Sequence, residues 1–182
     1  MKVTRLAIPD VCLLAPQAFG DARGFLLVSW QEEQFRREVA DAHFVQDNHS
    51  RSRRHTLRGL HFQAEHTQGK LVRCTSGRIW DVAVDVRRSS ATFGAWVAAD
   101  LSDENHHQLW LPAGFAHGFV VLSDSADMQY KVTDRYHPAS ERTLQWDDPA
   151  LGIPWPLDPG VMPLLSPKDA AGTLLSALEP LP

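Results

Sequence analysis

The chain has 182 residues, of which 43% are hydrophobic and 22% charged, and its formal net charge at pH 7 is -4. These values are typical of a single globular domain, 1–182, and the negative charge argues against nucleic acid or an anionic membrane as a general partner. Two cysteines are too few for a disulfide framework, and no run of residues could span a bilayer or serve as a signal peptide, so we expect a reduced, cytoplasmic protein.

Most of the chain predicts short β-strands separated by turn residues. In the segment 78–86, apolar residues from Trp80 to Val86 alternate with Asp81 and Asp85, which is the two-residue period of a strand. Many short strands between turns are typical of a β-sandwich or barrel. The expected strands are, in chain order, 25–30, 43–48, 57–63, 70–75, 78–86, 92–101, 108–112, 118–123 and 126–133.

A helix is expected between the first two of these strands, over 31–40. Phe35 and Val39 lie four positions apart and therefore share one helical face. Ser29 and Glu32 have the spacing of a capping box. The sequence therefore predicts a helix whose N-terminus is capped by Ser29.

A second helix is expected close to the C-terminus, over 166–178. Ser166 suits the N-cap position, Pro167 the first helical position and Asp169 the third. The preceding segment, 146–163, is too rich in proline for regular structure and should wrap around the surface.

His61 is the first candidate for chemistry. It lies in the expected strand 57–63, where Gly59 and Gln63 share its face while Leu60 and Phe62 occupy the other. Imidazole titrates near neutral pH, so His61 could act as a general base. A lone histidine on a strand is more often a structural residue, and spacing alone leaves both interpretations open.

The other histidines do not indicate a metal site. Metal ligands on a strand usually follow a His-x-His pattern or an equivalent spacing, and none of the nine histidines does. His61 and His66 are five positions apart across an expected turn, His106 and His107 are adjacent in a polar loop, and His117 stands alone. We therefore expect no metal.

Basic residues are concentrated between Arg51 and Arg73, where six Lys or Arg residues accompany a single acid, Glu65. The run 51–54 could simply be a solvated loop. Arg58 and Lys70 differ from it, because each adjoins strongly apolar strand sequence. Charges in such places need a partner, and an anionic ligand such as a phosphate or pyrophosphate would provide one.

Both tyrosines of the chain, Tyr130 and Tyr136, lie in one short stretch. A phenol can donate a proton and its ring can stack on a base, although ordinary strand packing would also explain each residue.

Asp169 likewise has two interpretations. It suits the first turn of a helix, and it could instead orient a catalytic imidazole.

Several long blocks, taken together and in order, resemble the dTDP-4-dehydrorhamnose 3,5-epimerases. The likeness runs from about Leu6 to the expected C-terminal helix. The matching blocks are 19–25, 44–52, 57–63, 68–74, 81–94, 108–124, 130–136 and 146–156. The resemblance implies an all-β, cupin-like jelly-roll barrel with a few short helices, including a C-terminal one. It also implies a homodimer that works without a metal or other cofactor.

The same resemblance implies a substrate and roles for four catalytic residues. The substrate would be dTDP-4-dehydro-6-deoxy-D-glucose, whose C3 and C5 hydrogens are acidified by the C4 ketone. His61 would be the general base, held by Asp169, and Tyr130 would be the general acid on the opposite face of the sugar. Lys70 would stabilise the enolate oxygen. The implied substrate-binding residues are Arg23, Gln46, Asn48, Arg58, His117, Glu141 and Lys168, with Tyr136 stacking on the thymine.

One position departs from the family pattern, since Val28 stands where the family usually has a ligand-contacting glutamate. This leaves room for an epimerase that acts only at C3 or only at C5 of a related dTDP-4-keto sugar. A 3,4-ketoisomerase on the same kind of barrel is a weaker alternative. A silent sugar-nucleotide binding module would be expected to lack His61, Tyr130 or Asp169, and a metal-dependent oxygenase would need an equimolar metal.

Overall fold

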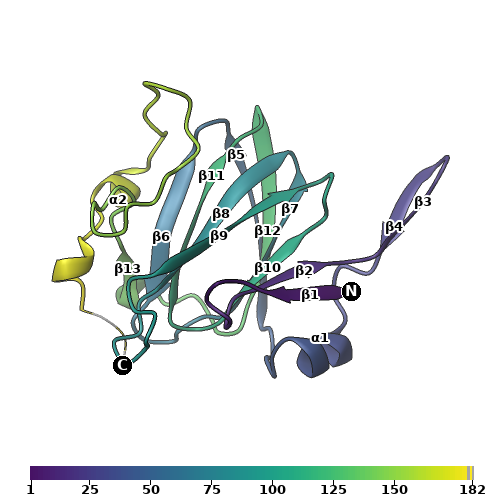
Figure 1. Ribbon diagram of the computed structural model, residues 1–182, viewed down its shortest axis with the longest axis horizontal. Coiled ribbons are helices and arrows are strands. Elements are labelled where there is room, and N and C mark those ends of the chain that lie inside the picture. Colours follow the sequence, from purple (N-terminus) through teal and green to yellow (C-terminus); the bar gives the residue numbers. More distant parts are fainter. Residues whose placement is uncertain (180, 182) are drawn as a thin grey trace.

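The computed structural model describes residues 1–179 and 181, and most of its strands form two antiparallel sheets that face each other (Figure 1). The larger sheet comprises, in spatial order, β1 (Lys2–Arg5), β2 (Cys12–Ala15), β10 (Gln108–Leu111), β7 (Lys70–Ser76), β12 (Ser125–Val132) and β5 (Gln46–Arg53). The smaller sheet comprises β13 (Glu141–Thr143), β6 (Leu57–Gln63), β11 (Phe115–Val121), β8 (Arg78–Asp85) and β9 (Trp96–Ser102). The predicted all-β fold is confirmed, with these strands in two sheets rather than in one closed ring.

Short helical segments complete the described part of the chain. They are α1 (Glu32–Glu38), α2 (Pro167–Ala170) and two 3₁₀ turns, Pro138–Ser140 and Leu175–Ala177. None of the helices in residues 1–179 and 181 is both long and apolar enough to cross a membrane.

The core between the two sheets is built from the inward-facing side chains of both. Burial of this apolar surface is the main favourable term in folding, and it fixes which face of each strand points inward. The larger sheet contributes Val72, Leu109, Leu111 and Met128, and the smaller sheet contributes Ile79, Val97, Phe115 and Phe119.

A second apolar cluster covers the outer face of the smaller sheet. Leu60, Phe62 and Val82 point outward there and pack against the C-terminal part of the chain, including Trp155 and Leu178. The proline-rich segment thus wraps over the sheet, as expected from its sequence. The smaller sheet is therefore covered on both faces.

Strand β8 shows what this double coverage does to an alternating pattern. The valines face the C-terminal segment, and Asp81 and Asp85 face the interior, where both are fully buried. Asp85 is bound by Arg87 and by the hydroxyls of Ser90 and Thr92. Asp81 lies on the same face, next to the polar side chains of the candidate site.

Two expected strands begin later in the structure than the sequence predicts. The strand expected at 43–48 is β5, Gln46–Arg53, so the basic run at 51–54 belongs mostly to an edge strand rather than to a loop. Arg51 is held there by Asp127, with Nε 2.6 Å from a carboxylate oxygen. The strand expected at 92–101 begins only at Trp96, because the preceding residues turn around Asp85.

The expected cap of the first helix is wrong. The N-cap of α1 is Gln31, whose side chain makes no capping hydrogen bond. Ser29 lies upstream, and its carbonyl oxygen accepts a hydrogen bond from Gln108 of β10. Helix α1 is held mainly by its apolar face, on which Phe35 packs against Trp110 of the larger sheet.

The C-terminal helix is much shorter than expected. The capping box at Ser166 and Asp169 is present, but α2 ends at Ala170. Thr173 then exchanges backbone hydrogen bonds with the chain at Thr143 and Gln145. A Cβ added to Gly172 would lie 2.7 Å from the Cα of Gln145, so this tertiary contact replaces the helix.

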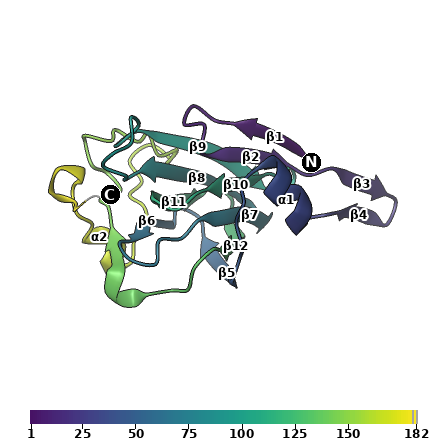
Figure 2. The same cartoon turned by 90° about the horizontal axis from the view of Figure 1, so that it is seen from below.

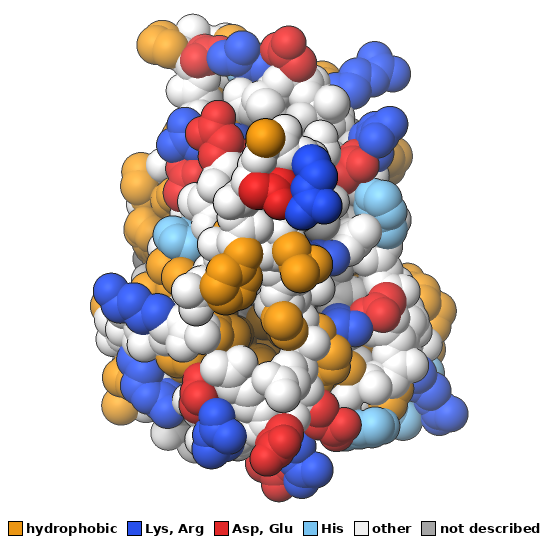
Figure 3. Space-filling model, turned by 90° about the vertical axis from the view of Figure 1, so that its right-hand side faces the viewer, with side chains coloured by type: hydrophobic (Ala, Val, Ile, Leu, Met, Phe, Trp, Pro, Cys, Tyr) orange, Lys and Arg blue, Asp and Glu red, His pale blue; other side chains and the backbone are white. Residues whose placement is uncertain are grey.

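A hairpin formed by β3 (Ala18–Asp21) and β4 (Gly24–Leu27) projects away from both sheets (Figures 1 and 2). It replaces the strand expected at 25–30. Its apolar side chains do not enter a core, since Phe19 is 60% and Leu26 74% exposed. Figure 3 views the side that carries the hairpin and shows apolar side chains gathered around a hollow.

Candidate active site

His61 and Asp169 form the centre of the candidate site. His61 points from β6 into the space between the sheets, and its Nε2 lies 2.6 Å from Oδ1 of Asp169 on α2. A carboxylate only accepts hydrogen bonds, so Nε2 carries a proton and Nδ1 of a neutral ring keeps its lone pair. Burial lowers the pKa of His61 below its ordinary value, although the hydrogen bond to Asp169 raises it. The imidazole is therefore neutral near pH 7 and can accept a proton.

Asp169 is fixed by several donors at once. Its carboxylate also accepts hydrogen bonds from the backbone N–H of Gly59, at 3.1 Å, and from the hydroxyl of Ser166, at 2.6 Å. Burial favours the neutral carboxyl, but the bonds from His61, Ser166 and Gly59 outweigh it and lower the pKa of Asp169 to about 2. A permanently charged carboxylate thus holds the imidazole in one orientation.

Ser166 gives a testable link between the helix cap and this pair. Ser166→Ala should lower the free energy of unfolding by about 1–2 kcal/mol, because it removes the cap and one donor to a buried carboxylate. Chemical denaturation would measure the loss. Ser166→Thr keeps a hydroxyl and should restore most of the stability, and equal losses in both variants would contradict the role of the hydroxyl.

Lys70 is buried beside His61. Its ammonium group donates to the backbone carbonyl of His61, at 3.3 Å. Burial lowers the pKa of Lys70 to about 8, while the negative charges of Asp81 and Glu141 act against that shift. The ammonium is mostly charged at neutral pH and can stabilise a developing oxyanion.

Tyr130 approaches from the larger sheet. It shares the inner face of β12 with Met128, and its strand partner on β5 is Asn48. Burial raises the pKa of the Tyr130 phenol, against the opposite effect of Arg58. The phenol therefore stays protonated at neutral pH and can donate a proton from the side opposite β6.

Three further predicted residues border the same space. Gln46 donates to the side-chain oxygen of Asn48, at 2.8 Å, so these two amides form one polar edge. Arg58 donates through Nε to the hydroxyl of Ser52, at 2.9 Å, and remains exposed at its tip. An exposed guanidinium anchored at one nitrogen is suited to binding a phosphate.

Glu141, Lys168 and Tyr136 form a second connected group beside α2. Lys168 Nζ lies 2.5 Å from one oxygen of Glu141, and the hydroxyl of Tyr136 donates to the other oxygen, at 2.8 Å. Tyr136 is 52% exposed, so most of its ring is free to stack on a flat ligand.

His117 and Asp81 lie on the inner face of the smaller sheet. His117 is the strand partner of His61, and its Nε2 lies 2.9 Å from Asp81. The family resemblance implies that His117 is a binding residue. The contribution of Asp81 was missed, and the only available signal was an acidic residue in an otherwise apolar strand.

Arg23 is the one predicted site residue that the fold does not bring to the others. It lies in the turn of the β3–β4 hairpin, its side chain is 89% exposed, and it pairs with Asp21. The hairpin stands clear of the gap between the sheets in both views (Figures 1 and 2). Within one chain, Arg23 therefore cannot act together with His61.

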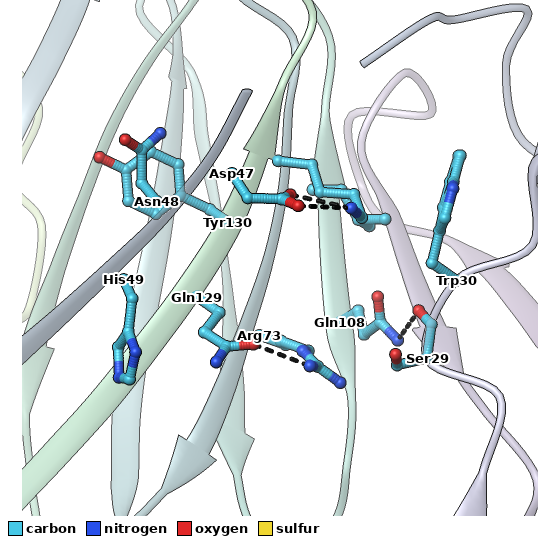
Figure 4. A pocket seen from close by; sticks show the side chains of 11 residues that line it. Ser29, Trp30, Asp47, Asn48, His49, Arg73, Gln108, Gln129 and Tyr130 are labelled. Atoms are coloured by element: carbon cyan, nitrogen blue, oxygen red, sulfur yellow. Dashed lines mark hydrogen bonds and ion pairs between the residues drawn. The ribbon is translucent and has the colours of Figure 1, made fainter. Parts of the chain in front are cut away.

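The outer face of the larger sheet carries a separate hollow of about 340 Å³ (Figure 4). Arg73 donates to Gln129 there, and Lys131 pairs with Asp47. Tyr130 borders this hollow, but its side chain points to the inner side of the sheet. The hollow is therefore distinct from the candidate site.

Within residues 1–179 and 181, no group of three or more His, Cys, Asp or Glu side chains could hold a metal ion.

Two facing β-sheets with a half-buried histidine paired to a buried carboxylate, a buried lysine and an inward-facing phenol define an enzyme scaffold suited to acid–base chemistry. The family model for dTDP-4-dehydrorhamnose 3,5-epimerase matches residues 5–177. The chain belongs to the dTDP-4-dehydrorhamnose 3,5-epimerase family.

Individual relatives agree with this assignment. The chain is 55% identical over 185 residues to a dTDP-4-dehydrorhamnose 3,5-epimerase of Pseudomonas aeruginosa, covering 100% of both chains. It is 55% identical over 179 residues to one of Neisseria gonorrhoeae, where the match covers 98% of this chain but only 54% of the relative. The chain thus spans about half the length of the Neisseria protein.

Among solved structures, the fold closely matches the dTDP-6-deoxy-D-glucose-3,5-epimerase of Legionella pneumophila in complex with dTDP-4-keto-L-rhamnose. The TM-score is 0.95 at 47% sequence identity, and the match covers 98% of this chain and 94% of that one.

Proposed function

We propose that this protein inverts both C3 and C5 of dTDP-4-dehydro-6-deoxy-D-glucose to give dTDP-4-dehydro-L-rhamnose. The observation that carries the proposal is the His61–Asp169 pair beside Lys70, with Tyr130 on the facing sheet, in a chain of this family. The Legionella relative, which binds dTDP-4-keto-L-rhamnose, supports the same type of ligand.

The proposed reaction consists of two similar proton exchanges. The C4 ketone acidifies the hydrogens on C3 and C5, and Nδ1 of His61 removes one of them to leave an enolate. The Lys70 ammonium stabilises the negative charge on the C4 oxygen. Tyr130 returns a proton to the opposite face of the carbon, which inverts it. Proton exchange with water then restores neutral His61 and the Tyr130 phenol, and the second carbon follows.

The nucleotide would bind at the edge of the same space. Arg58 is the proposed ligand of the pyrophosphate, since its guanidinium is exposed beside the anchoring contact to Ser52. Tyr136 would stack on the thymine. The other proposed substrate contacts are Gln46, Asn48, His117, Glu141 and Lys168.

The charge states predict a bell-shaped dependence of kcat/KM on pH. His61 must be neutral to accept a proton, and its pKa is lowered, so activity should extend into weakly acidic solution. Lys70 must be charged, and its pKa is about 8, so activity should fall as the pH rises through this value. Initial rates between pH 5 and 10 would measure both limbs, and a rate still rising above about pH 9 would contradict the role of Lys70.

The β3–β4 hairpin supports a homodimer in which each chain completes the site of the other. Its apolar residues are exposed, it carries Arg23 far from its own site, and β5 leaves an unpaired edge on the larger sheet. A hairpin that docks on a second copy would cover its apolar residues and bring Arg23 to the partner's bound pyrophosphate.

This arrangement predicts complementation between two defective chains. Arg23→Ala should raise KM about tenfold with little change in kcat, because it removes one phosphate contact. His61→Asn should be inactive. When the two variants are mixed and exchange subunits, activity at low substrate concentration should exceed that of either one alone. If mixed dimers formed but activity did not rise, Arg23 would act within its own chain, contrary to this prediction.

Proton exchange in D₂O tests the proposed function directly. The protein would be incubated with dTDP-4-dehydro-6-deoxy-D-glucose, and deuterium at C3 and C5 would be followed by NMR and mass spectrometry. Uptake at both carbons with inversion is the expected result. Uptake at only one carbon would identify a mono-epimerase, with Val28 as the first position to examine. A folded protein that binds dTDP without any exchange would overturn the proposal.

A further inference from the structure

Asp81 is a buried carboxylate that the proposed mechanism does not use. It lies on β8, a central strand of the smaller sheet, with 0% of its surface exposed. Its hydrogen-bond partner in the described part of the chain is His117, whose Nε2 lies 3.0 and 2.9 Å from the two carboxylate oxygens. A buried carboxylate normally requires more compensation than one imidazole supplies.

The complementary charge is on the opposite sheet. Lys70 is 8% exposed, and no acidic oxygen within 4 Å forms a salt bridge with it in residues 1–179 and 181. Its hydrogen bond goes to a neutral acceptor, the backbone carbonyl of His61. Asp81 and Lys70 are therefore opposite charges that face the same interior space without touching.

The charged and titratable groups around Lys70 limit what else could hold its charge. They are Asp81 on β8, Glu141 on β13, Lys168 and Asp169 on α2, His61 on β6, His117 on β11 and Tyr130 on β12. Glu141 is already paired with Lys168 at 2.5 Å, so its charge is largely compensated. Asp169 is already held by His61, Ser166 and Gly59, so Asp81 is the remaining anion that acts on the ammonium.

We propose that Asp81 is a positioning residue of the reaction, which keeps Lys70 charged without occupying its N–H groups and which orients His117 toward the substrate. A direct salt bridge would engage the ammonium protons that the enolate oxygen needs. At a distance, the carboxylate stabilises the charge and leaves those protons available. It also fixes the proton of His117 on Nε2, so that Nδ1 faces away from Asp81.

This inference rests on the proposed function only for the identity of the reaction. Asp81→Asn is the direct test, because Asn keeps an oxygen acceptor for His117 and removes the negative charge. The alkaline limb of the kcat/KM profile should move down from about pH 8 by about one unit. The value of kcat/KM at pH 7.5 should fall roughly threefold, while the affinity for dTDP should change less than about twofold.

Asp85→Asn is the matched control. Asp85 is also fully buried on the inner face of β8, but Arg87, Ser90 and Thr92 hold it away from the site. This variant should lose stability and keep the alkaline limb of the parent. An equal displacement of the limb in both variants would show that any damage to β8 has this effect, and would overturn the proposal.

The titration of Lys70 can be measured without substrate, by NMR of the lysine side chains, with Lys70→Arg used to assign the signal. The pKa of Lys70 should be lower in Asp81→Asn than in the parent, and an unchanged value would overturn the proposal. This result does not depend on turnover, so it separates a failure of the inference from a failure of the proposed epimerase activity.

His117→Gln provides a second test if Asp81→Asn does not fold. It removes the imidazole and leaves the carboxylate charge in place, so kcat should fall while the alkaline limb stays near pH 8. A downward displacement of the limb in His117→Gln would show that the histidine, and not the carboxylate, maintains the charge of Lys70. That outcome would contradict the role assigned to Asp81.

Discussion

Replacing His61 by Asn is expected to reduce epimerisation at both carbons by about 10³-fold or more. The substitution removes the lone pair of Nδ1, and the neighbouring imidazole, His117, is bonded to Asp81 and not to Asp169. The side-chain amide of Asn can still donate a hydrogen bond toward Asp169, whose carboxylate lies 2.6 Å from the imidazole in the parent protein. The fold and the affinity for dTDP should therefore remain close to those of the parent.

Turnover and deuterium exchange at C3 and C5 would be measured together with dTDP binding and the melting temperature. His49→Asn is a suitable control, because His49 also lies 3.3 Å from an aspartate, Asp127, but on the outer face of β5. It should leave activity unchanged. A His61→Asn protein that retained more than a few per cent of activity would remove His61 from the role of base.

Replacing Tyr130 by Phe is expected to separate proton removal from inversion. The ring that packs against the inner core is kept, and the phenol proton is lost. His61 can still remove the hydrogen and return a solvent-derived proton to the same face, so exchange should continue. Inversion should fall by about 10²-fold or more, because delivery to the opposite face needs the missing acid.

The ratio of deuterium uptake to inverted product measures this effect, and singly inverted product should accumulate. The same ratio in Met128→Leu, a change on the same inner face of β12, should match that of the parent. If Tyr130→Phe gives the same products at the same rates as the parent, another group is the acid.

The alternation of residues along the chain was sufficient to predict the β fold and to place His61 on the face opposite Leu60 and Phe62. Leu60 and Phe62 form an outer apolar layer, so His61 has to face inward. The same pattern could not show the importance of Asp81. Alternation places Asp81 opposite the valines of β8, but only the second sheet determines whether that face meets solvent or a buried lysine.

The errors have a common physical origin in contacts between distant segments. Helix α2 stops early because Gly172 packs on the backbone at Gln145, which no helix propensity can reveal. Ser29 does not cap α1, because its carbonyl is bonded to Gln108 of β10. Arg23 carries the right chemistry for a phosphate, but its hairpin sends it away from the rest of its own chain.

The pairing of His61 with Asp169 joins residues 108 positions apart in the chain. Activity therefore depends on an intact connection between two distant segments. The carboxylate arrives on α2, after a wrapping segment in which Met162 is 72% exposed. A single proteolytic cut at Met162 should break the covalent link between α2 and the sheets, so the base should lose its anchor before the two sheets come apart. Loss of activity should therefore reveal such damage earlier than circular dichroism does.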